Sequence, residues 1–141
     1  MRIARAQWET VLAHAREGYP FEVCGVLLGR HDSEVRVLAV VPVVNRETEQ
    51  PRVRYQIAPE DLIRVQRDGR ARGQEIVGYY HSHPDHPARP SETDRRVAAE
   101  GLSDGVVHVV VGVDKGERAQ GTAWIFRDTA QGFESERLEV E

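Results

Sequence analysis

Short apolar segments, separated by turns and by helix-like stretches, constrain most strongly what this chain can fold into. Residues 23–29 and 35–41 are apolar runs joined by a polar turn, which predicts a hairpin with a largely buried first strand. Residues 76–80 and 106–113 are further strand-like runs. Strands that alternate with helices indicate an α/β or α+β fold with a mixed sheet.

Helices are expected between these strands. An apolar stripe at helical spacing from Trp8 to Ala15 predicts a first helix that ends near Gly18. Pro59, which is followed by two acidic residues, opens a second helix, and Ser91 begins a third. The chain has 141 residues, about the length of one domain, so the whole of it is predicted to form a single unit. The remaining strands are expected at residues 53–57, 122–127 and 133–140.

Composition and charge exclude several classes of protein. The chain is 40% hydrophobic and 30% charged, and its formal net charge is -4 at pH 7. These values are typical of a globular protein, and the negative charge argues against nonspecific binding to nucleic acid. No apolar run reaches the ~18 residues of a membrane-spanning helix, and the N-terminus lacks the apolar stretch of a secretion signal. We therefore expect a cytoplasmic protein without a nucleic-acid or membrane partner.

The polar chemistry of the chain concentrates just after residues 76–80. His81 and His83 are two residues apart, so on a strand their imidazoles point to the same face. Asp94 lies one helical turn after Ser91, where its carboxylate can face back toward the end of the strand. Two nitrogens and one carboxylate oxygen, with a fourth position left to water, are the ligand set of catalytic zinc. These residues therefore predict a hydrolytic metal site.

A hydrolytic metal site also needs a base, and Glu22 is the natural candidate. It precedes an apolar strand, where burial would raise the pKa of its carboxyl. The chain has a single cysteine, Cys24, which excludes an internal disulfide and a cysteine-based zinc site. Any metal must therefore be held by histidines and carboxylates.

The order of these residues resembles the signature of the JAMM (MPN-plus) metalloprotease family. Glu22 stands before the apolar run, His-Ser-His-Pro fills residues 81–84, and Ser-x-x-Asp fills residues 91–94. Every position of the signature is filled, and the resemblance covers the whole chain. The chain looks most like the small stand-alone bacterial and archaeal members.

This resemblance implies a role for each residue of the motif. His81, His83 and Asp94 would bind zinc. Glu22 would act as the general acid and base, and Ser91 would donate a hydrogen bond to the oxyanion. The implied fold is a single MPN domain, with a mixed curved sheet flanked by helices, that is similar to the cytidine deaminases.

The activity that the resemblance implies is that of a zinc metallopeptidase or isopeptidase. JAMM enzymes cleave the amide bond after the C-terminal Gly-Gly of ubiquitin or of ubiquitin-like proteins. The chain resembles the small enzymes that release cysteine from a ubiquitin-like sulfur carrier protein, and it is also similar to relatives that free lysines from small modifiers. The loop at residues 45–52 has no room for the insertion with which eukaryotic members clamp a second ubiquitin. The expected partner is a sulfur carrier that ends in Gly-Gly, with cysteine and lysine both open as leaving groups.

The same residues have alternative interpretations. Ser91 and Asp94 also fit a helix capping box, a His-x-His pair often lies on a surface, and a glutamate at a strand start is often a solvated charge. The alternative function is a non-catalytic MPN scaffold that binds protein partners, although such proteins typically lose the ligands or the glutamate. A nucleic-acid role resembling that of RadC-type proteins is disfavoured by the net charge.

The remaining notable residues are expected to be structural. Cys24, in its apolar strand, is predicted to be a small buried hydrophobe rather than a nucleophile. His86 lies between the predicted ligands, where it could line the rim of the site and meet substrate. The other expectations are His14 and His31 on the surface, His108 satisfied in the core or at a sheet edge, and Trp8 and Trp124 as core aromatics.

Overall fold

The computed structural model describes residues 1–101, 104–127 and 132–141. Its helices are α1 (Arg5–Gly18), α2 (Pro59–Ala71) and α3 (Glu92–Glu100). Its strands are β1 (Arg2–Ile3), β2 (Cys24–His31), β3 (Val35–Val43), β4 (Glu75–Pro84), β5 (Val107–Asp114), β6 (Arg118–Arg127), β7 (Gly132–Glu136) and β8 (Glu139–Val140).

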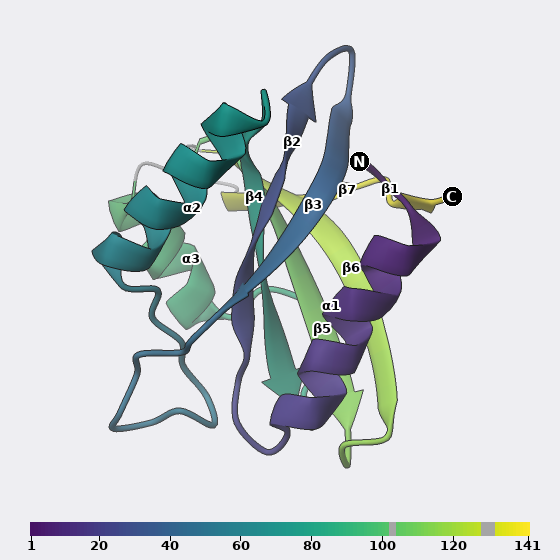
Figure 1. The fold of residues 1–141 in the computed structure, drawn as a ribbon. Helices are drawn as coiled ribbons and strands as arrows, with labels where there is room; N and C mark the ends of the chain where they lie inside the picture. The colour runs from purple at the N-terminus through teal and green to yellow at the C-terminus, as the bar shows by residue number, and fades with distance from the viewer. Residues whose placement is uncertain (102–103, 128–131) are drawn as a thin grey trace.

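One mixed sheet organises the described chain, with its strands in the order β7-β6-β5-β4-β2-β3-β1-β8. The sheet is curved, with α1 on one side and with α2 and α3 on the other (Figure 1). β4 lies at its centre, antiparallel to β2 and parallel to β5. This arrangement confirms the predicted mixed, curved sheet flanked by helices.

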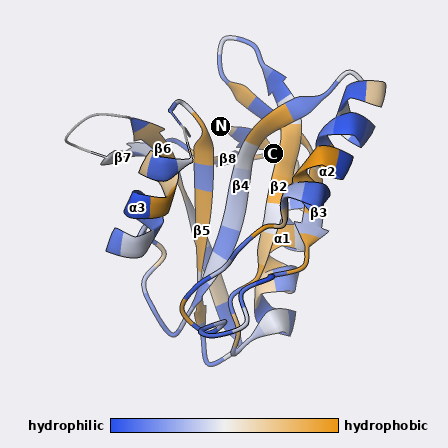
Figure 2. Cartoon of the chain, turned by 90° about the vertical axis from the view of Figure 1, so that its left-hand side faces the viewer, coloured by the Kyte–Doolittle hydropathy of each residue, from blue (hydrophilic) through white to orange (hydrophobic). Residues whose placement is uncertain are grey.

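The helices bury apolar faces against both sides of the sheet. On the α1 side, Trp8 and Val11 belong to the same core cluster as Val109 of β5. On the α2 side, Val65 packs with Val26 of β2. Because alternate residues of a strand face opposite sides, a strand that is covered on both faces is apolar throughout. β2 and β5 are accordingly among the most hydrophobic segments of the ribbon (Figure 2).

The pairing of β2 with β4 brings the two halves of the sequence motif together. Cys24 is paired with His81 across the two strands. The Val23 N–H donates to Ser82 Oγ at 2.9 Å, and the Ser82 N–H donates to the Val23 carbonyl oxygen at 3.0 Å. Glu22 directly precedes Val23 in the chain, so these hydrogen bonds place it beside the end of β4.

The structure corrects part of the predicted strand pattern. The three helices and the hairpin are confirmed, but residues 53–57 form a loop rather than a strand. Tyr55 and Ile57 still pack against the core, as their alternation indicates. No strand of the described chain pairs with this segment, and the Gln56 N–H donates instead to the side chain of Asn45 at 3.0 Å. The strand expected at residues 133–140 is divided into β7 and β8, and β1 was not expected because two residues carry no periodicity.

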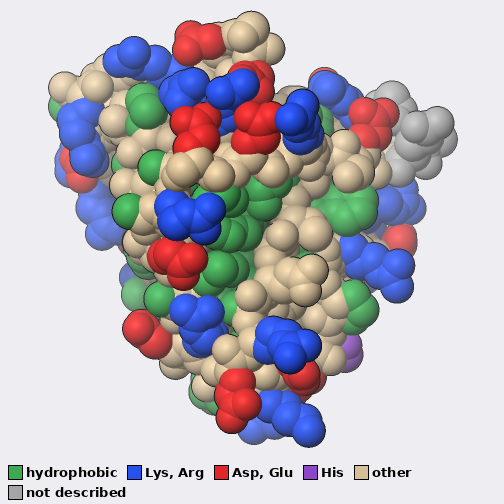
Figure 3. Space-filling view, turned by 90° about the vertical axis from the view of Figure 1, so that its right-hand side faces the viewer, with side chains coloured by type: hydrophobic (Ala, Val, Ile, Leu, Met, Phe, Trp, Pro, Cys, Tyr) green, Lys and Arg blue, Asp and Glu red, His purple; other side chains and the backbone are tan. Residues whose placement is uncertain are grey.

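The surface on the α1 side shows apolar side chains in a shallow hollow between charged ones (Figure 3). No helix in the described ranges is both long enough and apolar enough to cross a membrane. The cytoplasmic location and the single domain over residues 1–141 stay predictions.

Candidate active site

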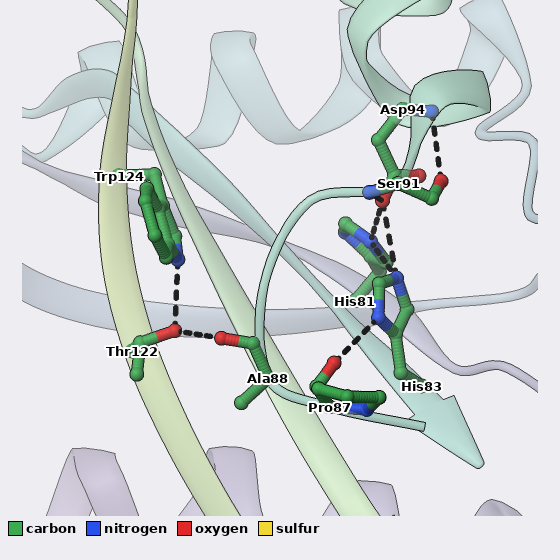
Figure 4. Close-up of polar contacts among 8 residues, drawn as sticks. All are labelled: His81, His83, Pro87, Ala88, Ser91, Asp94, Thr122 and Trp124. Atoms are coloured by element: carbon green, nitrogen blue, oxygen red, sulfur yellow. Dashed lines mark hydrogen bonds and ion pairs between the residues drawn. The ribbon is translucent and has the colours of Figure 1, made fainter. Parts of the chain in front are cut away.

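The end of β4 and the first turn of α3 bring three potential metal ligands to one point (Figure 4). His81 and His83 are buried, and their rings converge as their spacing predicts. Asp94 Oδ2 lies 3.1 Å from His81 Nε2 and 3.0 Å from His83 Nε2, and the two nitrogens are 3.0 Å apart. The three atoms therefore form a nearly equilateral triangle, which we call the ligand triangle.

Neighbouring groups orient the two imidazoles of the ligand triangle. His83 Nδ1 lies 3.0 Å from the carbonyl oxygen of Pro87, so Nδ1 carries the proton and the Nε2 lone pair faces the triangle. The ring of Tyr55 stacks on the ring of His81 at a centroid distance of 4.5 Å. Both rings are thus held with Nε2 directed at the carboxylate.

The ligand triangle fits a tetrahedral divalent cation. Zinc–ligand bonds of about 2.0–2.1 Å in tetrahedral geometry place neighbouring ligand atoms roughly 3.3 Å apart, close to the distances seen here. A carboxylate oxygen of Glu22 and one nitrogen from each of His81 and His83 also lie within 4.8 Å of one another. Asp94 Oδ2 is closer to both nitrogens, so Asp94 is the better-placed candidate for a third ligand, and Glu22 lies at the edge of the cluster.

Electrostatic interactions favour the charge states that a metal centre requires at Asp94 and His81. Burial by itself raises the pKa of Asp94, but hydrogen bonds with His81 and His83 outweigh burial and hold that pKa well below its ordinary value. Burial also lowers the pKa of His81. At His83 burial by itself lowers the pKa, but the hydrogen bonds with Asp94 and with the Pro87 carbonyl oxygen together outweigh burial and raise it. An ionised carboxylate and a neutral imidazole are the forms that bind a metal ion.

Glu22 supplies a buried carboxyl beside the ligand triangle. Only 5% of its surface is exposed, and Oε1 has no hydrogen-bond partner among the described residues. Burial raises the pKa of this carboxyl to about 8, despite the opposing effect of His83. Its main chain is held on both sides, because the Glu22 N–H donates to the Pro51 carbonyl oxygen at 2.7 Å and Asn45 Nδ2 donates to the Glu22 carbonyl oxygen at 3.0 Å. A fixed carboxyl with a pKa near neutrality is suited to proton transfer.

Ser91 is the N-cap of α3. Its Oγ accepts a hydrogen bond from the Asp94 N–H at 3.0 Å, and its own N–H donates to Asp94 Oδ2 at 2.8 Å. The capping box expected as the structural alternative is therefore present, and the same Oδ2 also faces the two histidines. Within the described ranges no side chain accepts the proton of the Ser91 hydroxyl, which leaves it available to a substrate oxygen.

The loop between β4 and α3 is fastened to β6 (Figure 4). Thr122 Oγ1 donates to the carbonyl oxygen of Ala88, and Trp124 Nε1 donates to Thr122 Oγ1 at 2.8 Å. Gly112 of β5 permits the close approach of the loop, because a Cβ at this position would lie 2.9 Å from the carbonyl oxygen of His86. This loop latch, formed by Thr122 and Trp124, fixes the segment whose carbonyl group orients the ring of His83.

The loop latch was not predicted from the sequence, and two residues lie in other surroundings than predicted. Trp124 is half-buried and hydrogen-bonded rather than a core aromatic, whereas Trp8 is buried as predicted. His14 is half-buried rather than on the surface, and its Nδ1 lies 2.8 Å from the hydroxyl of Tyr80. Thr122 and Trp124 are two residues apart, so on a strand their side chains lie on the same face. This spacing could have indicated their contact from the sequence.

The other notable residues largely match their expectations. Cys24 is fully buried, and burial raises the pKa of its thiol to about 12, which fits a small hydrophobe and not a nucleophile. His31 and His86 are exposed, and His86 lines a cleft of the site. His108 is buried on β5, but its Nε2 has no partner in the described part of the chain, so the expectation of a satisfied histidine is wrong for that atom.

Two clefts border the ligand triangle. The Glu22 cleft, of about 470 Å³, is lined by Glu22, His83 and Ser91 together with residues of the loops before α2 and before α3. The α3 cleft, of about 430 Å³, is lined by Asp94, by Tyr55 and by further residues of α3. The clefts adjoin, because two of their lining residues are shared. Both clefts therefore reach the site.

Two named proteins are similar in sequence to part of this chain. A desampylase of Haloferax volcanii is 40% identical over 95 residues, which cover 64% of this chain and 67% of the desampylase. A CysO-cysteine peptidase of Mycobacterium tuberculosis is 34% identical over 90 residues, which cover 64% of this chain and 60% of that protein. The chain thus spans less than two thirds of the mycobacterial relative.

Solved structures share the fold over nearly the whole chain. The solution structure of a protein from Desulfitobacterium hafniense matches with a TM-score of 0.86 at 28% identity, over 99% of this chain and 92% of the other. A JAB1/MPN domain protein from Archaeoglobus fulgidus matches with a TM-score of 0.63 at 22% identity, over 99% and 98% of the two chains. The second likeness supports the fold alone.

A protein-family model matches most of the chain. The model described as prokaryotic homologs of the JAB domain matches residues 5–127. The two named relatives are enzymes, which confirms the prediction of a hydrolase. The chain therefore belongs to the family of prokaryotic homologs of the JAB domain, as its resemblance to JAMM proteins predicts.

Proposed function

We propose that this protein is a zinc-dependent isopeptidase that hydrolyses the amide bond after the C-terminal Gly-Gly of a ubiquitin-like sulfur carrier protein. The observation that carries the proposal is the ligand triangle, with its distances of 3.0–3.1 Å, beside the buried carboxyl of Glu22. A metal centre with an adjacent proton acceptor is the arrangement that amide hydrolysis requires.

The residues of the site have separate tasks in this reaction. A zinc ion held by His81, His83 and Asp94 would supply Lewis-acid chemistry, by acidifying water and polarising the substrate carbonyl. Glu22 accepts the proton of the attacking water on its carboxylate and returns it to the departing amine. A neighbouring cation favours the ionised form of Glu22, which is the form that accepts a proton. The Ser91 hydroxyl donates a hydrogen bond to the oxyanion, a contribution typically worth ~3 kcal/mol.

The proposed substrate is supported by the relatives and by the clefts. One relative is named for CysO-cysteine, and another is named a desampylase. An extended Gly-Gly tail can lie along the main chain around Tyr55 in the α3 cleft, where glycines avoid side-chain clashes. The loop between β3 and α2 spans residues 44–58 and forms no helix or strand of its own. It adds no folded insertion, so recognition comes from the carrier and its tail rather than from a clamp on a second folded modifier.

A cleavage assay tests this proposal. The substrates are the organism's own Gly-Gly-terminated ubiquitin-like protein joined to cysteine and, separately, to a lysine side chain. We expect mass spectrometry to show release of the intact carrier, and we expect a chelator to stop it. Glu22→Gln should bind zinc normally and lose about 10²–10⁴-fold in rate.

Two outcomes would contradict the proposal. If neither conjugate is cut while an unrelated unstructured peptide is degraded rapidly, the protein is a general metallopeptidase. If the carrier binds but zinc does not and no bond is cleaved, the protein is the scaffold considered as the alternative.

A further inference from the structure

We propose that the Glu22 cleft binds a leaving group that carries a carboxylate, through the guanidinium groups of Arg54 and Arg89. The preferred substrate is then a carrier joined to the amine of a free amino acid, rather than to a lysine side chain of a folded protein. This inference rests on the proposed function, because it names the leaving group of the same reaction.

Proton transfer determines which cleft receives the leaving group. The departing amine must lie within hydrogen-bond reach of the acid that protonates it. Glu22 lines the Glu22 cleft together with Ser91, whereas the residues that line the α3 cleft include Asp94 but not Glu22. The amine therefore departs into the Glu22 cleft, and the Gly-Gly tail extends into the α3 cleft.

The charge of the Glu22 cleft suits an anion, although the chain as a whole has a net charge of -4. Arg54 and Arg89 come from two different loops, are exposed, and both line this cleft, and Arg54 also lines the adjoining α3 cleft. Among the described residues, neither guanidinium has a carboxylate within 4.0 Å. Glu22, the proposed base, is the one acidic residue that the described chain contributes to the lining. In the α3 cleft, by contrast, Glu47 and Glu100 accompany the arginines.

A free amino acid places its carboxylate where these arginines can bind it. A single carbon separates the carboxylate from the scissile nitrogen, so both groups must lie in the same cleft near Glu22. A guanidinium binds a carboxylate through paired, charge-assisted hydrogen bonds. The exposed side chains of Gln50 and His86 line the same cleft and can donate further hydrogen bonds. A lysine side chain would instead bring uncharged methylene groups next to the scissile nitrogen.

The test compares two forms of one conjugate. The organism's Gly-Gly-terminated ubiquitin-like protein is joined to alanine, as the free acid or as the carboxamide, so that thiol chemistry plays no part. We expect kcat/KM to be about 10- to 100-fold higher for the free acid, the range for a hydrogen bond to a charged group. Arg89→Gln and Arg54→Gln should each remove most of this preference by slowing cleavage of the free acid. Arg70→Gln removes the same charge from an exposed position on α2, and this matched control should keep the full preference.

Each contrary result points to a different error. Equal kcat/KM for the acid and the carboxamide in the unaltered protein would overturn the inference. Arginine variants that slow both forms equally would also overturn it, because the arginines would then bind the carrier and not the leaving group. If no conjugate is cleaved while zinc is bound, the proposed function itself fails and the inference fails with it.

Discussion

Replacing Glu22 with glutamine should stabilise the metal-free protein at pH 8 and have a much smaller effect at pH 5. The carboxyl of Glu22 is buried, and burial raises its pKa from an ordinary 4.5 to about 8. A carboxyl whose pKa is raised by folding stabilises the fold while it is protonated, and this contribution is lost as the pH rises from 4.5 through about 8. Glutamine does not ionise, so the variant avoids this loss.

The difference between 4.5 and about 8 corresponds to on the order of 4 kcal/mol in the free energy of unfolding, at about 1.4 kcal/mol per pH unit. The assay is urea-induced unfolding of chelator-treated protein at pH 5 and at pH 8. Glu49→Gln, at an exposed position, is the matched control and should change the free energy of unfolding by less than about 0.5 kcal/mol. An equal effect of Glu22→Gln at both pH values would refute the reasoning, because the carboxyl would then not be desolvated.

Three further predictions concern residues outside the ligand triangle. Thr122→Val removes both hydrogen bonds of the loop latch and should weaken zinc binding about 10- to 100-fold, measured by competition with a chromophoric chelator. Thr122→Ser should restore the affinity for zinc. Unchanged zinc affinity in the valine variant would exclude an orienting role for the latch. Gly112→Ala should lower the free energy of unfolding by about 1–3 kcal/mol, because the added Cβ would lie 2.9 Å from the His86 carbonyl oxygen, and a variant of wild-type stability would contradict this. Burial lowers the pKa of His108 from 6.5 to about 4, so stability should fall by on the order of 2 kcal/mol as the pH drops from 6.5 toward about 4.5. His108→Leu should remove this part of the pH dependence in urea unfolding, and the same slope in both proteins would show that His108 is not responsible.

The convergence of His81, His83 and Asp94 was predictable because their geometry follows from local spacing. His81 and His83 share a face of one strand. Asp94 lies in the first turn of α3, the helix for which Ser91 is the N-cap. The place of Glu22 is different, because it depends on hydrogen bonds between residues 59 apart in sequence. Its apolar surroundings suggested a buried base, but the family resemblance was needed to connect it with the histidines.

Other features depend on tertiary contacts that periodicity does not encode. The alternation of apolar and polar residues correctly indicated that Tyr55 and Ile57 face the core. A strand also requires a neighbouring strand with free main-chain hydrogen-bonding groups, and the described chain places no such strand beside residues 53–57. The loop latch joins Thr122 to a carbonyl group 34 residues away, and its existence depends on the path of the intervening loop. The contact between His14 and Tyr80 likewise joins residues 66 apart.

The zinc content of the purified protein and of its ligand variants tests the central claim most directly. Three protein ligands and one water complete a tetrahedral site, so elemental analysis should find about one zinc ion per chain in the unaltered protein. Glu22→Gln should keep this zinc, because Glu22 is assigned to proton transfer and not to metal binding. His81→Ala and Asp94→Ala should each lose most of it. Stoichiometric zinc in both of these variants would contradict the assignment of the ligand triangle as the metal site.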